Sequence, residues 1–135
     1  FGSSIGEGNY TRPQGEVVWL EKNTELQTDV DPLAADDKIL NLEVLSSGVI
    51  PKGVKAVSMT SQIKNSSITS DQGIRWGKDS ANSGRVWNYP IVNNVFSQGQ
   101  GWTDCDANGD IYQLVTEAGD TLSALYQTII GVQLR

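Results

Sequence analysis

Residues 54–63 read Val-Lys-Ala-Val-Ser-Met-Thr-Ser-Gln-Ile, and this stretch decides the fold class. In its second half, two sets of side chains alternate along the chain. One set is apolar or small, and the other is polar: Val57, Met59, Ser61 and Ile63 against Ser58, Thr60 and Gln62. A period of two places each set on its own face of a β-strand. The segment is therefore expected to be a strand with one buried face.

Shorter segments with strand character flank this stretch, separated by polar or glycine-containing turns. Expected strands are 17–20, 38–45, 54–63, 74–76, 85–92, 111–116 and 125–134. Pro90 confines part of 85–92 to an edge or a bend. Together with the segment 98–104, these ranges give about eight or nine short strands without strand–helix alternation, which predict an all-β, jelly-roll-like antiparallel β-sandwich. We expect residues 17–135 to form this single domain and residues 1–16 to form an extended arm or linker.

The charge of the chain argues against partners that are polyanions. The net charge is −6 and the pI is about 4.4, so nucleic acids and anionic membrane surfaces would be repelled. No apolar run reaches the roughly 18 residues that a membrane-spanning helix needs, so no membrane insertion is expected. Residues 28–37 are acidic, and we expect a solvated loop there, with a cation site as the alternative.

The absence of histidine excludes several kinds of catalytic and metal site. The chain has no histidine and one cysteine, Cys105. Ser-His-Asp and Cys-His catalysis, histidine-based zinc sites and an intramolecular disulfide are therefore excluded. We expect Cys105 to be a buried or half-buried thiol without a chemical task. No pair of carboxylates stands out as a glycosidase pair, and the chain is expected not to be an enzyme.

Residues 104–111 read Asp-Cys-Asp-Ala-Asn-Gly-Asp-Ile and allow two interpretations. Oxygen-bearing side chains at alternate positions, followed by glycine, match the first half of a calcium-binding loop. The candidate ligands are Asp104, Asp106, Asn108 and Asp110. Val115 stands where such a loop needs its bidentate glutamate, although Glu117 could supply an oxygen. The alternative is a β-hairpin whose Asn108-Gly109 pair forms a type I′ turn. No other cofactor is expected.

Aromatic residues beside polar segments make the chain a candidate for sugar binding. The candidates are Trp76, Trp87, Tyr89 and Trp102. Aromatic faces pack against the C–H surfaces of sugars, while neighbouring amides and carboxylates bind hydroxyl groups. The alternative for each tryptophan is a place in the core or in a subunit interface, with its indole N–H bonded.

Four segments from residue 49 onward resemble a module of bacteriophage tail-fibre and virion-decoration proteins. Residues 49–57, Val-Ile-Pro-Lys-Gly-Val-Lys-Ala-Val, are similar to its Ile-Pro-x-Gly-x-Lys-Ala-Val opening. Ile74-Arg75-Trp76 is similar to its short aromatic strand, and residues 106–113 to its Asp-x-Asn-Gly-x-Ile hairpin. Residues 129–134 resemble its closing hydrophobic strand. The likeness covers about two-thirds of the chain and lies in turn-and-strand patterns, which mark fold more than chemistry.

The resemblance implies a non-enzymatic structural module on the exterior of a virion. Such modules are jelly-roll sandwiches, often homotrimers, and an amino-terminal arm ties them to other virion proteins. Either a tail-fibre receptor-binding tip, attached to a host cell-surface glycan, or a capsid decoration protein fits. The alternatives from other classes are a carbohydrate-binding module of a secreted enzyme and a polysaccharide hydrolase.

Overall fold

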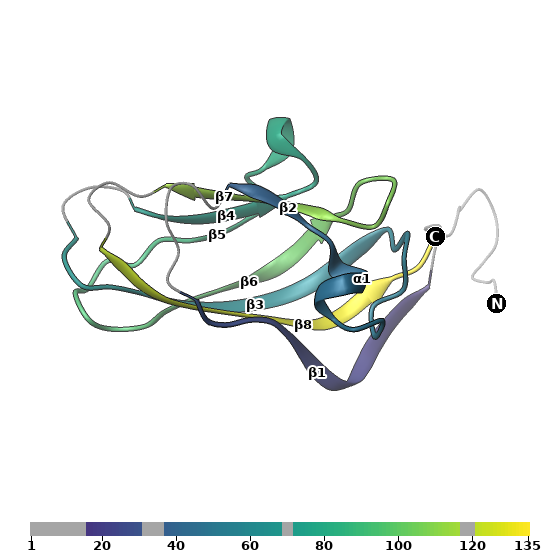
Figure 1. Cartoon of the computed structure of the whole chain (residues 1–135), viewed down its shortest axis with the longest axis horizontal. Helices are drawn as coiled ribbons and strands as arrows, with labels where there is room; N and C mark the ends of the chain where they lie inside the picture. The colour runs from purple at the N-terminus through teal and green to yellow at the C-terminus, as the bar shows by residue number, and fades with distance from the viewer. Residues whose placement is uncertain (1–15, 31–36, 69–71, 117–120) are drawn as a thin grey trace, which may run out of the picture.

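The computed structural model describes residues 16–30, 37–68, 72–116 and 121–135, with the backbone alone at Val30. Two four-stranded antiparallel sheets face each other (Figure 1). Sheet A contains, in spatial order, β1 (Val17–Val30), β8 (Leu122–Gln133), β3 (Ala56–Asn65) and β6 (Ser97–Asp104). Sheet B contains β2 (Lys38–Leu40), β7 (Ile111–Thr116), β4 (Gly73–Gly77) and β5 (Val86–Asn88). The predicted all-β sandwich is confirmed.

The strand pairing is nested in the manner of a jelly roll. β1 pairs with β8, β2 with β7, β3 with β6 and β4 with β5, each in the antiparallel sense. A long antiparallel ribbon folded into two sheets produces this order, and two Greek keys result. The outermost strands of the sequence, β1 and β8, therefore lie side by side in sheet A.

The core lies between the sheets and contains the predicted face of β3. Val57, Met59, Ser61 and Ile63 are buried, whereas Gln62 is exposed. Ile74 and Trp76 of β4 approach from sheet B, and Leu125 and Ile129 of β8 complete the centre. Alternation of this kind buries one face of a strand and leaves the other face for solvent or for ligands.

A network of buried glutamines links the two sheets. Gln27 of β1 donates to Gln127 at 2.7 Å within sheet A and to Gln113 of β7 at 2.8 Å across the core. The indole N–H of Trp76 donates to the same Gln113 oxygen at 3.0 Å. Buried amides are stable only with such partners, so the network constrains how the sheets align.

Residues 38–45 do not form the single strand that the sequence predicts. β2 ends at Leu40, and α1 (Leu42–Leu45) follows it. Asn41 caps this short helix, because its side-chain oxygen accepts a hydrogen bond from the Val44 amide at 3.1 Å. Gly48 ends the turn with a φ of 85° and donates to the carbonyl of Glu43. Leu42 still reaches the core, and it does so from a helix.

Other predicted boundaries also move. β5 ends at Asn88, so residues 89–92 do not continue the expected strand toward Pro90. β1 is longer than residues 17–20 and extends into the acidic segment 28–37, of which residues 31–36 lie outside the described part. Four residues of β1 separate Trp19 from Thr24, whereas a single residue of β8 separates their partners, and β1 bends sharply there (Figure 1).

The expected arm, residues 1–16, lies outside the described residues except for Glu16. The carbonyl of Glu16 accepts a hydrogen bond from the Leu134 amide at 2.8 Å, which extends the β1–β8 pairing. No helix in the described part of the chain is both long and apolar enough to cross a membrane.

Candidate functional site

The outer face of sheet A carries ordered rows of polar side chains. Because the strands are in register, Gln100, Thr60, Thr128 and Glu25 form one row across β6, β3, β8 and β1. The next row contains Gln98, Gln62 and Tyr126. These rows come from four strands that are far apart in the sequence, and only the jelly-roll order brings them together.

A groove of about 330 Å³ follows these rows. Amide, hydroxyl and carboxylate groups dominate its lining, with one aromatic ring: Asn23, Glu25, Thr60, Ser61, Gln62, Gln98, Gly99, Gln100, Tyr126 and Thr128. Gln62, Gln98 and Gln100 are exposed, and their side chains make no hydrogen bond to any residue that the structure describes. Their donors and acceptors therefore point to solvent and are available to a ligand.

An aromatic pair lies at each end of the groove. In the row beyond Gln100, the rings of Trp19 and Trp102 meet edge to face, with 5.8 Å between their centroids. Trp19 is 62% exposed and Trp102 is 40% exposed. Gly131 lies beneath the Trp19 ring, where an added Cβ would come within 2.7 Å of it. The absence of a side chain at Gly131 thus leaves room for the indole next to β8.

The second aromatic pair begins in the row of Gln98 and Gln62, which contains Tyr126, and its other ring, Phe96, lies beside Lys64. Phe96 and Tyr126 also meet edge to face, at a centroid distance of 5.8 Å. The Lys64 ammonium lies 4.7 Å from the centre of the Phe96 ring, within the range of a cation–π contact. The outer face of sheet A thus presents a polar groove with an aromatic pair at each end, and we call this surface the groove face.

Trp76 does not belong among the sugar-binding candidates. It is 0% exposed, and its indole N–H is bonded to Gln113 in the core. Its side chain alternates with that of Arg75 along β4, so it points between the sheets and not outward. The interpretation of Trp76 as a core residue is confirmed, and that of a ligand contact is wrong.

The remaining three candidates fall on opposite faces of the molecule. Trp102 belongs to the groove face, whereas Trp87 and Tyr89 lie on the sheet B side beside Arg75. Arg75 Nε donates to the Tyr89 hydroxyl at 2.7 Å, and the guanidinium lies 5.8 Å from the Trp87 ring centre and 5.7 Å from that of Tyr89. Trp87 is 61% exposed. The predicted aromatic residues therefore do not form one site.

The calcium candidates do not converge on a common point. Asp106 Oδ1 accepts hydrogen bonds from the amides of Asn108 and Asp110, at 2.9 and 3.0 Å, so this carboxylate holds its own turn. Burial, and next the Asp106 charge, raise the pKa of Asp110 above its usual value. Among the described residues, no group of three or more acids or cysteines is placed to hold a metal ion.

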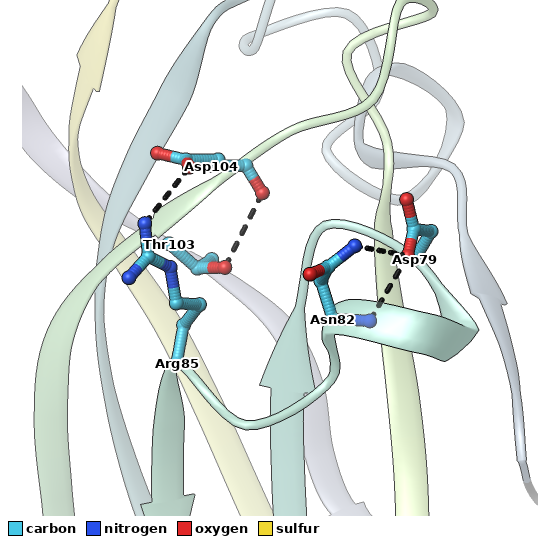
Figure 2. Close-up of polar contacts among 5 residues, drawn as sticks. All are labelled: Asp79, Asn82, Arg85, Thr103 and Asp104. Atoms are coloured by element: carbon cyan, nitrogen blue, oxygen red, sulfur yellow. Dashed lines mark hydrogen bonds and ion pairs between the residues drawn. The ribbon is translucent and has the colours of Figure 1, made fainter.

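Asp104 is turned toward a different partner. Its carboxylate pairs with Arg85 at 3.1 Å, and Figure 2 shows this ion pair joining the end of β6 to the segment before β5. In the same view, the backbone and side-chain amides of Asn82 donate hydrogen bonds to the Asp79 carboxylate, which caps η2 (Ser80–Asn82), and these hydrogen bonds lower the pKa of Asp79. Asp104 and Asp106 are therefore both engaged in local structure, and the calcium interpretation of residues 104–110 finds no support.

The type I′ hairpin interpretation of the same segment also needs correction. β6 and β7 belong to different sheets, so the turn between them carries the chain across the sandwich. Gly109 has a φ of 82°, but Asn108 is not in the left-handed region that a type I′ turn requires. An added Cβ at Gly109 would lie 2.5 Å from the Gly53 amide nitrogen, so the turn packs closely on the neighbouring loop.

Most residues of the groove face are missed by sequence reasoning. One signal is present in residues 97–102, Ser-Gln-Gly-Gln-Gly-Trp, where glutamine and tryptophan alternate with glycine. Such alternation gives a strand one face of large polar and aromatic side chains. Trp19 and Tyr126 carry no comparable signal, because their position depends on the pairing of β1, β8 and β3.

No protein-family model matches the chain, and the comparison with curated proteins finds no match either.

Proposed function

We propose that the chain is a non-enzymatic module on the exterior of a bacteriophage virion, and that it attaches the particle to carbohydrate on the host cell. The observation that carries this proposal is the groove face, where exposed aromatic rings flank unbonded amides on a rigid sheet. Recognition by a polar groove suits a receptor-binding tip better than a decoration protein, which would need a surface complementary to the capsid.

The fold and the sequence resemblance support the same assignment without determining it. Jelly rolls occur both in virus capsids and in lectins, so the architecture is compatible with particle assembly and with sugar binding. Fold alone does not specify function, and the argument therefore depends on the side chains of the groove face. The strands that carry them are fixed by the core, which gives a preorganised site.

A carbohydrate-binding module of a secreted enzyme is the second candidate. The same groove and the same aromatic pairs would serve it equally well. The two candidates differ in the source of the sugar, because an enzyme module binds the polymer that its enzyme degrades. They differ also in valence, since attachment of a particle uses several copies of a weak site.

The test is a binding screen of the purified chain against two sets of polysaccharides. One set contains bacterial surface polysaccharides, and the other contains structural polymers such as cellulose, xylan and mannan. Binding within the bacterial set supports attachment, whereas binding only to structural polymers supports the enzyme module. Release of new reducing ends from any bound polymer would contradict a non-enzymatic role, and an absence of all binding would contradict both candidates.

A further inference from the structure

We infer that the groove face binds an uncharged polysaccharide along the direction of the strands, and that it contacts internal sugar units of the polysaccharide. This inference rests on the proposed function and names the site and the ligand class for it. It assigns a binding role to Gln62, Gln98, Gln100 and Trp19, none of which was among the candidates from the sequence.

The dimensions of the face fit a chain better than a single sugar. The rows follow one another every second residue of β3, from Ser58 beside Trp102 to Lys64 beside Phe96. At about 3.3 Å per residue, these six steps span roughly 20 Å. Trp102 and Phe96 stand at the limits of this span, and the two polar rows, one of which contains Tyr126, lie between them. A polymer of several rings can therefore contact both pairs at once.

The chemistry of the lining matches sugar hydroxyl groups. Each glutamine amide offers two donors and an acceptor, and the threonine and tyrosine hydroxyls both donate and accept. A sugar hydroxyl also donates and accepts, so adjacent hydroxyls can bond to one amide. The indoles of Trp19 and Trp102 offer exposed apolar surface for the C–H face of a ring. Amides in the centre and aromatic rings at the ends thus correspond to the two kinds of surface on a sugar chain.

The charge of the groove face favours an uncharged polysaccharide over acidic polymers as its ligand. Glu25 is the single ionisable acid in the lining, and Lys64 lies at the far end, so the groove holds no cluster of cations for a polyanion. The whole chain carries a net charge of −6, which repels acidic polymers further. A protein partner would require apolar anchors at the centre of the contact, but the centre of this face is polar. An uncharged polysaccharide satisfies each of these conditions.

The sheet B side supplies a matched control. Trp87 is as exposed as Trp19, yet it lies beside the Arg75 guanidinium and outside the groove. Replacing Trp87 removes an exposed indole from the opposite face and leaves the groove face intact. A loss of binding specific to the groove face can therefore be distinguished from a general effect of removing surface tryptophans.

The experiment measures the affinity of the full chain for neutral polysaccharides by affinity electrophoresis and titration calorimetry. The probes are dextran, mannan, galactan and the neutral polymers found in the screen, with alginate as the anionic comparison. We expect Trp102→Ala to weaken binding at least about tenfold, as for the loss of a large aromatic contact. Gln100→Ala should weaken it about three- to tenfold, as for one or two lost hydrogen bonds. Trp87→Ala should bind like the unchanged chain.

Several outcomes would overturn the inference, and they differ from failure of the proposed function. If Trp87→Ala loses binding while Trp102→Ala and Gln100→Ala retain it, the sugar site lies on the sheet B side and attachment stands. Preference for alginate would refute the uncharged ligand class alone. If the unchanged chain binds no polysaccharide, both proposals fail. The melting temperature of each variant is measured in parallel, and unchanged melting shows that lost affinity does not reflect unfolding.

Discussion

At the scale of single residues, Cys105 gives the clearest prediction of reactivity. The thiol is buried after β6, and burial, followed by the Asp106 charge, raises its pKa to about 12. The thiolate is the reactive form, so the folded protein should react very slowly with an aryl disulfide reagent near pH 8. After unfolding in urea, one thiol per chain should react at once. Rapid reaction of the folded protein would contradict the burial of Cys105.

The raised pKa of the Cys105 thiol also predicts how the stability of the protein changes at alkaline pH. In the unfolded chain the thiol has its ordinary pKa of 9.0, whereas in the folded chain it stays protonated up to about 12. The folded state then binds more protons than the unfolded state, so the free energy of unfolding should fall as the pH rises from 9 toward 12. Urea melts of the unchanged chain and of Cys105→Ala measure this effect, because the variant lacks this contribution.

Gln113 is the residue on which the buried network converges. Replacing it with leucine removes the acceptor of the Trp76 indole and of the Gln27 amide in the core. Buried donors left without partners cost about 1–3 kcal/mol, and we expect Gln113→Leu to lower the free energy of unfolding by about this amount. The matched control is Gln62→Leu on the exposed face, which should change stability by about 0.5 kcal/mol or less. Urea denaturation of the two variants and of the unchanged chain measures their free energies of unfolding.

At the scale of elements, the turn after β6 is stabilised by the side chain of Asp106, which belongs to the turn itself. The Asp106 carboxylate accepts hydrogen bonds from two backbone amides. Asp106→Ala should therefore lower the free energy of unfolding by about 1 kcal/mol, as for the loss of a helix cap. Because this carboxylate is already engaged and Asp104 pairs with Arg85, calcium at about 1 mM should not raise the melting temperature. A calcium-dependent rise that Asp106→Ala abolishes would restore the calcium site.

A substitution at Gly131 of β8 tests whether the packing of Trp19 from β1 against β8 shapes the groove face. An added methyl group would come within 2.7 Å of the Trp19 ring, and the exposed ring would have to move. Gly131→Ala should therefore change tryptophan fluorescence and weaken polysaccharide binding, while the melting temperature changes little. Ser123→Ala, on an exposed position of the same strand, serves as the control. Unchanged fluorescence in Gly131→Ala would contradict the described position of Trp19.

Regular strands can be predicted from the sequence because their burial pattern is local. β4 and β7 lie where the sequence places them, and the alternation within β3 identifies its buried face correctly. The strand prediction for residues 41–45 is wrong because a short helix with apolar Leu42, Val44 and Leu45 resembles an alternating strand. The signals that oppose a strand are the Asn41 cap and the glycine at 48, and both act through backbone hydrogen bonds.

The groove face can be predicted only in part, because it depends on register between distant strands. The glutamine–glycine alternation of β6 is local, and it marks one wall of the groove. The neighbours of Gln100 are Thr60 and Thr128, and nothing in their sequence surroundings shows that they meet. Trp76 and Trp102 stand in similar polar surroundings in the sequence, yet one is buried and the other exposed. Which face of a strand is covered follows from the whole sandwich.

At the scale of the whole molecule, the sandwich separates stability from recognition. The core and the glutamine network hold both sheets, and the groove face contributes little to that packing because its side chains point to solvent. An open polar groove gains little energy from each sugar, so a single copy should bind weakly. Attachment of a particle through such a site requires several copies that act together, because linked weak sites gain avidity.

This requirement leads to a prediction about assembly. If the chain acts on a virion, we expect a closed symmetric oligomer, and a homotrimer fits the sequence resemblance. Light scattering at several concentrations should then give three times the chain mass of 14.6 kDa. The trimer should bind an immobilised neutral polysaccharide more tightly than the same chain binds a short soluble oligosaccharide. A strict monomer with equal affinity for both would contradict avidity and favour the carbohydrate-binding module of an enzyme, for which one groove per enzyme is sufficient.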